Sequence, residues 1–407
     1  MHLSQNQGDA EVGSLAVAWL ELTVRWIHVI AGVAWIGTSF YFNWLNDRLT
    51  TPTDAPEGVT GELWSVHGGG FYRVMKFGVA PDRMPEELHW FKWEAYLTAL
   101  SGLALLVLVY YLGADVYMVV PGGLSPGAAI GVGVATLIGG WFVYDALCRS
   151  PLGRRTPALA TVGFLLATLI AWGLVQFIGS RAAYIHMGAM LGTIMALNVF
   201  RVIIPAQREM VADLVAGREP DGAVGEHAAL RSLHNNYMTL PVLFIMVSIH
   251  YAMTYGHRYN WAILAALALI GAGTRHYFNL RNRGRHNAWI LPGAALAMVA
   301  LAFVSSGLSR PRLADREGGE IVSFEAVRAV IVGRCAVCHS EQPSHALFDA
   351  PPAGVMFDTP ELIRAYADRI YATAVESTVM PLGNFTGMTD DERALIAAWI
   401  RQGAEIE

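Results

Sequence analysis

Long apolar stretches separated by short polar segments dominate the first three quarters of the chain. Eight of these stretches are long enough to cross about 30 Å of hydrocarbon as α-helices. They cover residues 15–45, 93–112, 126–147, 157–179, 182–204, 238–254, 261–279 and 288–308. The pattern predicts an all-α fold over residues 1–309, a polytopic eight-helix membrane bundle whose first helix protrudes into water at residues 43–48.

Positive charges concentrate in alternate connections between these stretches. The connections 46–92, 148–156, 205–237 and 280–287 hold five, three, three and three Lys or Arg, whereas the others hold only Arg181 and Arg258. Because Lys and Arg accumulate in cytoplasmic loops, both termini are predicted to lie outside the cytoplasm, which for a bacterial inner membrane means in the periplasm. The N-terminus carries Asp9 and Glu11 and no Lys or Arg before Arg25, which is unlike a cleavable signal peptide.

Two of these connections are long enough to hold structure of their own. In the first, residues 65–74 form an aromatic and β-branched run broken by three glycines, which predicts a short hairpin or flap in the cytoplasmic loop 46–92. In the connection 205–237, residues 215–225 are rich in Gly, Pro and charge and predict an exposed turn.

A polar linker at residues 310–319 separates the bundle from a predicted soluble domain at residues 320–407. Its first helix is expected near 324–334, and a second begins with Thr359 as N-cap and Pro360 at the first helical position. The last helix begins at a capping box formed by Thr389 and Glu392 and ends near Gly403. These signals predict a small α-helical domain.

The overall composition narrows the class of protein. Hydrophobic residues make up 54% of the 407 and charged residues only 15%, which indicates a multi-span protein in contact with membrane lipid. A net charge of −5 without a basic patch argues against a nucleic-acid partner. Of three cysteines, Cys148 is expected to be a buried or cytosolic thiol.

The other two cysteines form a CxxCH with His339. Cys335 and Cys338 can form thioethers with the haem vinyls, and the imidazole of His339 can then bind the iron. A zinc or redox CxxC would be the alternative, but a zinc site needs more ligands. Met380, followed by Pro381, is the expected second axial ligand, with Met388 and Met356 as competitors. The sequence therefore predicts one covalent haem c in a cytochrome c domain.

Ionisable groups at membrane depth are costly, so each is a candidate for function. Arg25, His28, Gly32, Trp35, Ser39 and Phe42 lie on one face of the first predicted helix. With His186 and His250, Arg25 and His28 are expected to form an outer polar layer; alternatively, His28 merely hydrogen-bonds across the bundle. An inner layer is expected from Glu94, Asn198, Arg201, His234, Asn235, Asn236, His276 and Asn279. Glu94 is a possible counter-ion of Arg201 or a proton acceptor, whereas Asp145 is expected to pair with Arg149.

Four stretches together resemble a known family. They are RWIHVIAGVAWIG at 25–37, VHGGGFYR at 66–73, LHWFKWEAY at 88–96 and LHNNYMTLPVLF at 233–244. In this order they resemble the bacterial membrane-bound urate oxidase (urate hydroxylase) family, whose members join an eight-span domain to a C-terminal cytochrome c. The resemblance implies oxidation of urate to 5-hydroxyisourate, with electrons leaving through haem c to a soluble cytochrome c or a terminal oxidase.

The catalytic residues expected from physical reasoning are His28, Arg25, His186, Glu94 and Asn235. An Arg clamp, aromatic stacking and amide hydrogen bonds suit the flat urate anion. An alternative function is an electron-transfer subunit that passes electrons from quinol or a partner to haem c. In that protein, histidines such as His28 and His186 would hold a b-type haem. A transporter with a tethered cytochrome is a third possibility.

Overall fold

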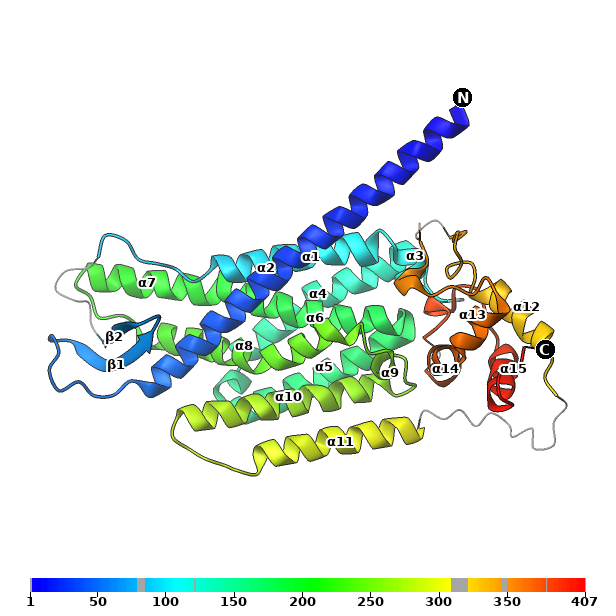
Figure 1. Ribbon diagram of the computed structural model, residues 1–407. Coiled ribbons are helices and arrows are strands. Elements are labelled where there is room, and N and C mark those ends of the chain that lie inside the picture. Colours follow the sequence, from blue (N-terminus) through cyan, green and yellow to red (C-terminus); the bar gives the residue numbers. More distant parts are fainter. Residues whose placement is uncertain are drawn as a thin grey trace.

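The described part of the chain is mostly helical and includes a small β-hairpin (Figure 1). The computed structural model describes residues 2–78, 85–120, 122–308, 321–345, 348, 350–377 and 379–406. The predicted linker 310–319 lies outside the described residues.

Long helices run side by side and form the bundle (Figure 1). They are α1 (His2–Arg48), α2 (Trp93–Leu105) continued by η1 (Leu106–Tyr111), α4 (Pro126–Arg149), α5 (Thr156–Phe177), α6 (Ser180–Leu197) continued by η3 (Asn198–Ile203) and α7 (Ile204–Val215), α8 (Gly222–Ser248), α10 (Asn260–Asn282) and α11 (Ile290–Leu308). Short helices α3 (Ala114–Tyr117), η2 (Pro151–Arg154) and α9 (Ala252–Tyr255) connect them.

Five of the described helices are long and apolar enough to cross a membrane. They are Leu15–Arg48, Trp93–Tyr111, Pro126–Arg149, Thr156–Phe177 and Ser180–Val215. Large apolar side chains cover their outer faces, for example Trp19, Leu165 and Phe142. Helices also occupy the other three predicted positions, but α8 and α10 mix apolar with polar residues, so a total of eight spans stays a prediction.

Strands β1 (Val59–His67) and β2 (Gly70–Phe77) form the antiparallel hairpin expected in the first long connection. The turn is made by Gly68 and Gly69, whose φ angles of 56° and 81° are in the left-handed region that glycine tolerates best. Figure 1 shows the hairpin and α7 at one end of the bundle, here called the hairpin end, and η2 connects α4 with α5. The connections rich in Lys and Arg are those at this end.

The start of the sixth helix differs from the prediction. The sequence predicted a loop as far as residue 237, but α8 begins at Gly222, where Asp221 accepts a hydrogen bond from the Ala223 amide. The predicted exposed turn shrinks to the few residues between α7 and α8. The polar run 234–236 therefore lies inside a helix, where His234, Asn235 and Asn236 bond to side chains on neighbouring helices.

The C-terminal domain packs at the opposite end of the bundle, beside α3 and α9 (Figure 1). It consists of α12 (Phe324–Arg334), η4 (Pro352–Gly354), α13 (Pro360–Ala365), α14 (Ala367–Ile370), η5 (Tyr371–Glu376), η6 (Leu382–Asn384) and α15 (Asp390–Arg401). The predicted caps are confirmed: Thr359 accepts from the Leu362 amide, and Thr389 and Glu392 form the capping box.

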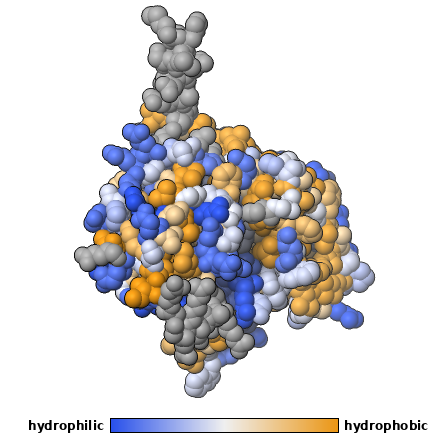
Figure 2. All heavy atoms as spheres, turned by 90° about the vertical axis from the view of Figure 1, so that its right-hand side faces the viewer, coloured by the Kyte–Doolittle hydropathy of each residue, from blue (hydrophilic) through white to orange (hydrophobic). Residues whose placement is uncertain are grey.

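Each part of the chain has its own hydrophobic core. One buried cluster lies among α4, α5 and α6 and includes Trp141, Tyr184 and Met190, and another lies among α12, α13 and α15 around Ile331 and Trp399. Viewed from the C-terminal-domain end, the surface mixes hydrophilic and hydrophobic residues (Figure 2). This mixture contrasts with the apolar outer faces of the bundle helices.

Candidate functional site

A cavity of about 490 Å³ lies at the hairpin end of the bundle. It is bordered by α1, the segment 88–91, the continuous helix α6–η3–α7, and α8. Its aromatic lining comes from Trp35, Phe42, His89, Trp90 and Phe91, and its polar lining from Thr38, Ser39, Gln207, Ser232, Asn235 and Thr239. Aromatic walls with a few polar groups suit a flat ring compound that forms hydrogen bonds.

Asn235 is the predicted site residue that lines this cavity. Its Oδ1 accepts a hydrogen bond from Asn198 Nδ2 at 2.8 Å, and its Nδ2 donates to the Met195 carbonyl at 2.9 Å. Both ends of the amide are thus fixed in direction. Gln207 and Ser232, by contrast, form no side-chain hydrogen bond to another described residue and can bind a ligand.

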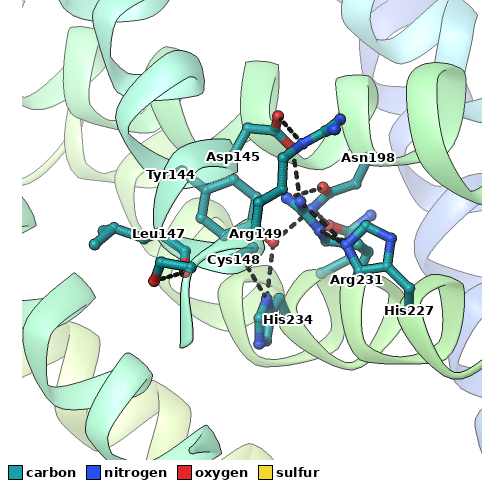
Figure 3. A network of polar contacts seen from close by, with 11 residues as sticks. Tyr144, Asp145, Leu147, Cys148, Arg149, Asn198, His227, Arg231 and His234 are labelled. Atoms are coloured by element: carbon teal, nitrogen blue, oxygen red, sulfur yellow. Dashed lines mark hydrogen bonds and ion pairs between the residues drawn. The ribbon is translucent and has the colours of Figure 1, made fainter. Parts of the chain in front are cut away.

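Behind Asn235 lies a network of polar contacts that joins α4, η3 and α8 (Figure 3). Asn198 Oδ1 accepts from Arg231 Nη1 at 3.4 Å, and Arg231 Nη2 forms an ion pair with Asp145 at 2.6 Å. The Arg231 side chain is fully buried, whereas Asp145 also pairs with the exposed Arg149 at 2.7 Å. The network therefore connects the cavity wall with the surface at the hairpin end.

A tyrosine and a histidine extend the network. Tyr144 Oη accepts from Asn198 Nδ2 at 3.0 Å and lies 2.8 Å from His234 Nδ1. The buried thiol of Cys148, as expected from the sequence, lies 3.9 Å from the same nitrogen. Tyr144 thus connects Asn198 with the imidazole of His234.

The backbone around Asn198 is unusual. η3 is a π-helical segment inside an otherwise α-helical rod, and such segments occur frequently at functional sites. It turns Asn198 toward α4 and α8 and places Val199 and Ile203 on the cavity wall. A π-helical turn is one residue longer than an α-helical turn, and the sequence carries no simple signal for this insertion.

The predicted outer residues have separate partners. Arg25 pairs with Glu21 one turn earlier on the same helix. His28 Nδ1 lies 3.0 Å from both the Thr98 carbonyl and Ser101 Oγ on α2, which is the cross-bundle hydrogen bonding considered from the sequence. These contacts do not bring Arg25 or His28 to a common site with His186.

His186 lies in the core of the bundle. It is fully buried, its Nδ1 lies 2.8 Å from the Ala182 carbonyl, and its ring stacks on Tyr111 at 5.8 Å. Its Nε2 has no hydrogen-bond partner among the described residues and lies against Gly133, where a Cβ would come within 2.4 Å. His28 thus contacts α2 at Thr98 and Ser101, whereas His186 contacts Tyr111 on η1 and Gly133 on α4.

The inner residues divide between the network and other contacts. Asn236 Oδ1 accepts from Arg275 Nε at 2.9 Å and from Asn279 Nδ2 at 2.8 Å. Glu94, at the first turn of α2, and Arg201 form no ion pair with each other, so that predicted pairing is wrong. Asp145 pairs with Arg149 as predicted.

Sequence reasoning overlooked Asp145 and Arg231 as members of a site. The signal was present in the spacing: His227, Arg231 and Asn235 follow at intervals of four and share a helix face. It became visible only once α8 was known to begin at Gly222, because a loop has no such face.

The CxxCH lies at the end of α12. The His339 amide donates to the Cys335 carbonyl at 2.9 Å, and His339 Nδ1 lies 3.0 Å from the Val355 carbonyl. With Nδ1 held by this carbonyl, Nε2 is free to bind a metal. Burial lowers the pKa of His339, which favours the neutral imidazole that metal binding needs.

The methionine candidates differ in their surroundings. Met388 is buried in the core of the C-terminal domain, while Met380 is partly buried and contacts both that core and the core of the bundle. Arg393 Nη1 donates to the Met380 carbonyl at 2.8 Å and so fixes the loop that carries it. Among the described residues, no three His, Cys, Asp or Glu side chains are grouped to hold a metal ion.

Comparison with protein families places the larger part of the chain in one family. The model of the urate oxidase N-terminal family matches residues 14–306. The chain belongs to this family. Both the cavity and the network of Asp145 and Arg231 lie within the residues that the urate oxidase N-terminal family covers, whereas the CxxCH lies beyond them. Among curated proteins and among solved structures, none matches the chain.

Proposed function

We propose that the protein oxidises urate to 5-hydroxyisourate and passes the electrons to a covalently bound haem c. The observation that carries this proposal is the aromatic and amide-lined cavity of about 490 Å³ inside the urate oxidase N-terminal region. The CxxCH domain at the other end of the same chain supplies an acceptor.

Urate is flat and carries hydrogen-bonding groups around its whole edge. Trp35, Phe42 and Trp90 provide aromatic surface on which the rings stack. Asn235, Gln207 and Ser232 supply hydrogen bonds to ring nitrogens and carbonyl oxygens. Asn198 and the Met195 carbonyl already fix the Asn235 side chain by hydrogen bonds. Asn235 can therefore orient the substrate without a further loss of side-chain conformational entropy.

The reaction converts the urate monoanion and one water into 5-hydroxyisourate, one proton and two electrons. The pair formed by Tyr144 Oη and His234 Nδ1, next to Asn198, accepts that proton. Its position at the hairpin end provides a short way to the surface.

Cys335 and Cys338 would hold the haem through thioethers, and His339 Nε2 and Met380 Sδ would bind its iron. When bound, the haem supplies one-electron transfer to a soluble cytochrome c or a terminal oxidase. The hydrogen bond of His339 to Val355 orients the imidazole, and Arg393 holds the methionine loop.

The proposed orientation places the hairpin end in the cytoplasm and the C-terminal domain in the periplasm of a bacterial inner membrane. Several described helices are long and apolar enough to cross it, and Lys and Arg gather in the hairpin-end connections. Urate would then reach the cavity from the cytoplasm.

The proposal is tested by adding urate to the purified, oxidised protein without oxygen and recording the haem c α-band. Urate should reduce the haem, and Trp90→Ala should raise the urate concentration needed. Trp289→Ala, at a position 81% exposed and outside the cavity lining, is the matched control and should behave like the unmodified protein. Reduction by quinol but not by urate would refute the enzyme and favour an electron-transfer subunit.

A further inference from the structure

The loop at residues 379–384, here called the Met380 loop, joins the C-terminal domain to the bundle. Val379 is 9% exposed and belongs to the buried cluster of the bundle, although it is part of the C-terminal domain in sequence. Met380 packs against both buried clusters. Figure 1 shows the C-terminal domain against the end of the bundle formed by α3 and α9.

The bundle approaches this loop closely at two glycines. At Gly256, directly after α9, a Cβ would lie 2.3 Å from Val379 Cγ2 and 2.7 Å from the Ser377 carbonyl oxygen. Gly383 is inside the loop, with φ of 59°, and a Cβ there would lie 3.0 Å from the Val119 carbonyl oxygen. A side chain at Gly256 must therefore displace the loop, because carbon atoms do not come this close to backbone oxygen.

The C-terminal domain holds the loop from the other side. Arg393 is 6% exposed, and it donates hydrogen bonds to the carbonyls of Ala374 and Met380 and, at 3.3 Å, to Asn384 Oδ1. The Met380 amide donates to the Thr373 carbonyl at 2.8 Å. The backbone of Met380 is thus fixed between a buried guanidinium and the end of the bundle.

We infer that the bundle positions the axial methionine: contact of Gly256 with Val379, opposed by Arg393, sets where Met380 Sδ lies. The inference rests on the proposed haem c. Axial ligation and its surroundings set the potential of a c-type haem, so docking of the two domains determines the driving force for electrons leaving the bundle. Gly256 and Arg393 act as positioning residues, since neither touches the iron.

The test is Gly256→Ala in the full chain, with Gly127→Ala as control. Gly127 is at the same end of the bundle, and a Cβ there would meet nothing within 4 Å. Gly256→Ala should lose or weaken the methionine-to-iron charge-transfer band and lower the haem potential, with haem still covalently attached. Gly127→Ala should retain both. An unchanged band and potential in Gly256→Ala would overturn the inference.

A second substitution keeps the test decisive if Gly256→Ala does not yield folded protein. Val379→Ala removes the side chain that occupies the bundle core and adds no crowding, so it should also weaken the band. In the double variant, Val379→Ala should partly restore the band of Gly256→Ala, because the nearest contact is gone. A band that is normal in Val379→Ala, or that depends on Met388 instead of Met380, would refute the positioning role.

The outcomes separate this inference from the proposed function. Absence of covalent haem in the unmodified protein would remove the proposed haem c itself. If haem is covalently attached but the methionine-to-iron band is unchanged in Gly256→Ala and Val379→Ala, the proposed function stays intact. Only the role of the bundle is then refuted.

Discussion

The ion pair of Asp145 and Arg231 offers a quantitative test of the network behind the cavity. The Arg231 side chain is fully buried, and Asp145 is its only carboxylate partner among the described residues. Asp145→Asn leaves a buried guanidinium without a counter-charge, which costs about 3–5 kcal/mol. Arg149→Ala removes the other partner of Asp145, but the Arg149 side chain is 67% exposed, so about 0–1 kcal/mol is expected.

Unfolding of the two variants in detergent measures this difference, and urate titration measures its effect on the cavity. Asn198 is bonded to both Arg231 and Asn235, so a shift of Arg231 should weaken one hydrogen bond to urate. About 1 kcal/mol, or roughly fivefold in Kd, is expected for Asp145→Asn. Replacing both partners, as Asp145→Leu with Arg231→Met, should restore much of the stability. Equal losses in Asp145→Asn and Arg149→Ala would refute this account.

Three further predictions concern topology, pH and thiol access. A reporter active only in the periplasm should be active when fused after Gly113 and silent after Arg154; the reverse result would contradict the orientation. Hydrogen bonds from Arg334 hold the pKa of Glu392 below its usual range, so its contribution to stability is present at neutral pH and lost as the pH falls through that lowered pKa. Glu392→Gln should therefore lower the unfolding temperature of the C-terminal domain at neutral pH but not in acid. An equal decrease at both pH values would contradict the stabilising role of the Glu392 carboxylate. Cys148 is only 6% exposed, so it should react with a thiol reagent only after unfolding. Rapid reaction in the native protein would contradict its burial.

Local signals predicted the elements whose causes are local. Thr359 and Thr389 cap their helices because each hydroxyl reaches an amide three residues ahead, and the sequence shows this directly. The hairpin turn at Gly68 and Gly69 has an equally local cause. The start of α8 was wrong because its polar residues are satisfied by Asp145 on α4 and Asn198 on η3, which are distant in sequence.

The site was predicted in part for the same reason. A polar layer near the hairpin end was expected, and the structure does join Asn198 with Asn235 and Asn236 with Asn279. The residues predicted to share one face of α1 do share it. Their spacing does not reveal, however, which helix packs on that face. His28 bonds to Thr98 and Ser101 on α2, whereas His186 bonds to the Ala182 carbonyl on its own helix.

Distance decides where oxidation can occur. The cavity and the CxxCH lie at opposite ends of the bundle: Met195 of the cavity and Ser180 are 15 positions apart on α6, about 22 Å along the axis. Electron tunnelling falls steeply with distance, so under the proposed function electrons that leave urate in the cavity need a carrier between the cavity and the CxxCH. Pyridine haemochromogen spectra, which count b and c haems, show whether a second haem supplies it.

Aromatic side chains lie within this interval, and we predict that electrons pass through them toward the C-terminal domain, along what is here called the aromatic route. Trp141 and Tyr144 lie 6.2 Å apart between ring centres near the cavity, and Tyr110 and Tyr117 lie 5.9 Å apart toward the C-terminal domain. Burial raises the pKa of Tyr117, which lies on α3 beside the C-terminal domain. In a protein with haem c alone, Tyr117→Leu should slow urate-dependent haem reduction without changing the Kd for urate.

The control for this route is Tyr251→Leu, at a position 51% exposed, which should leave the rate unchanged. Reduction by dithionite should be equally fast in both variants, because it reaches the haem from solution. If Tyr117→Leu is as fast as the unmodified protein while His186→Ala abolishes reduction, the aromatic route is refuted. Urate would then have to be oxidised near His186, closer to the C-terminal domain, and the hairpin-end cavity would serve only for its uptake.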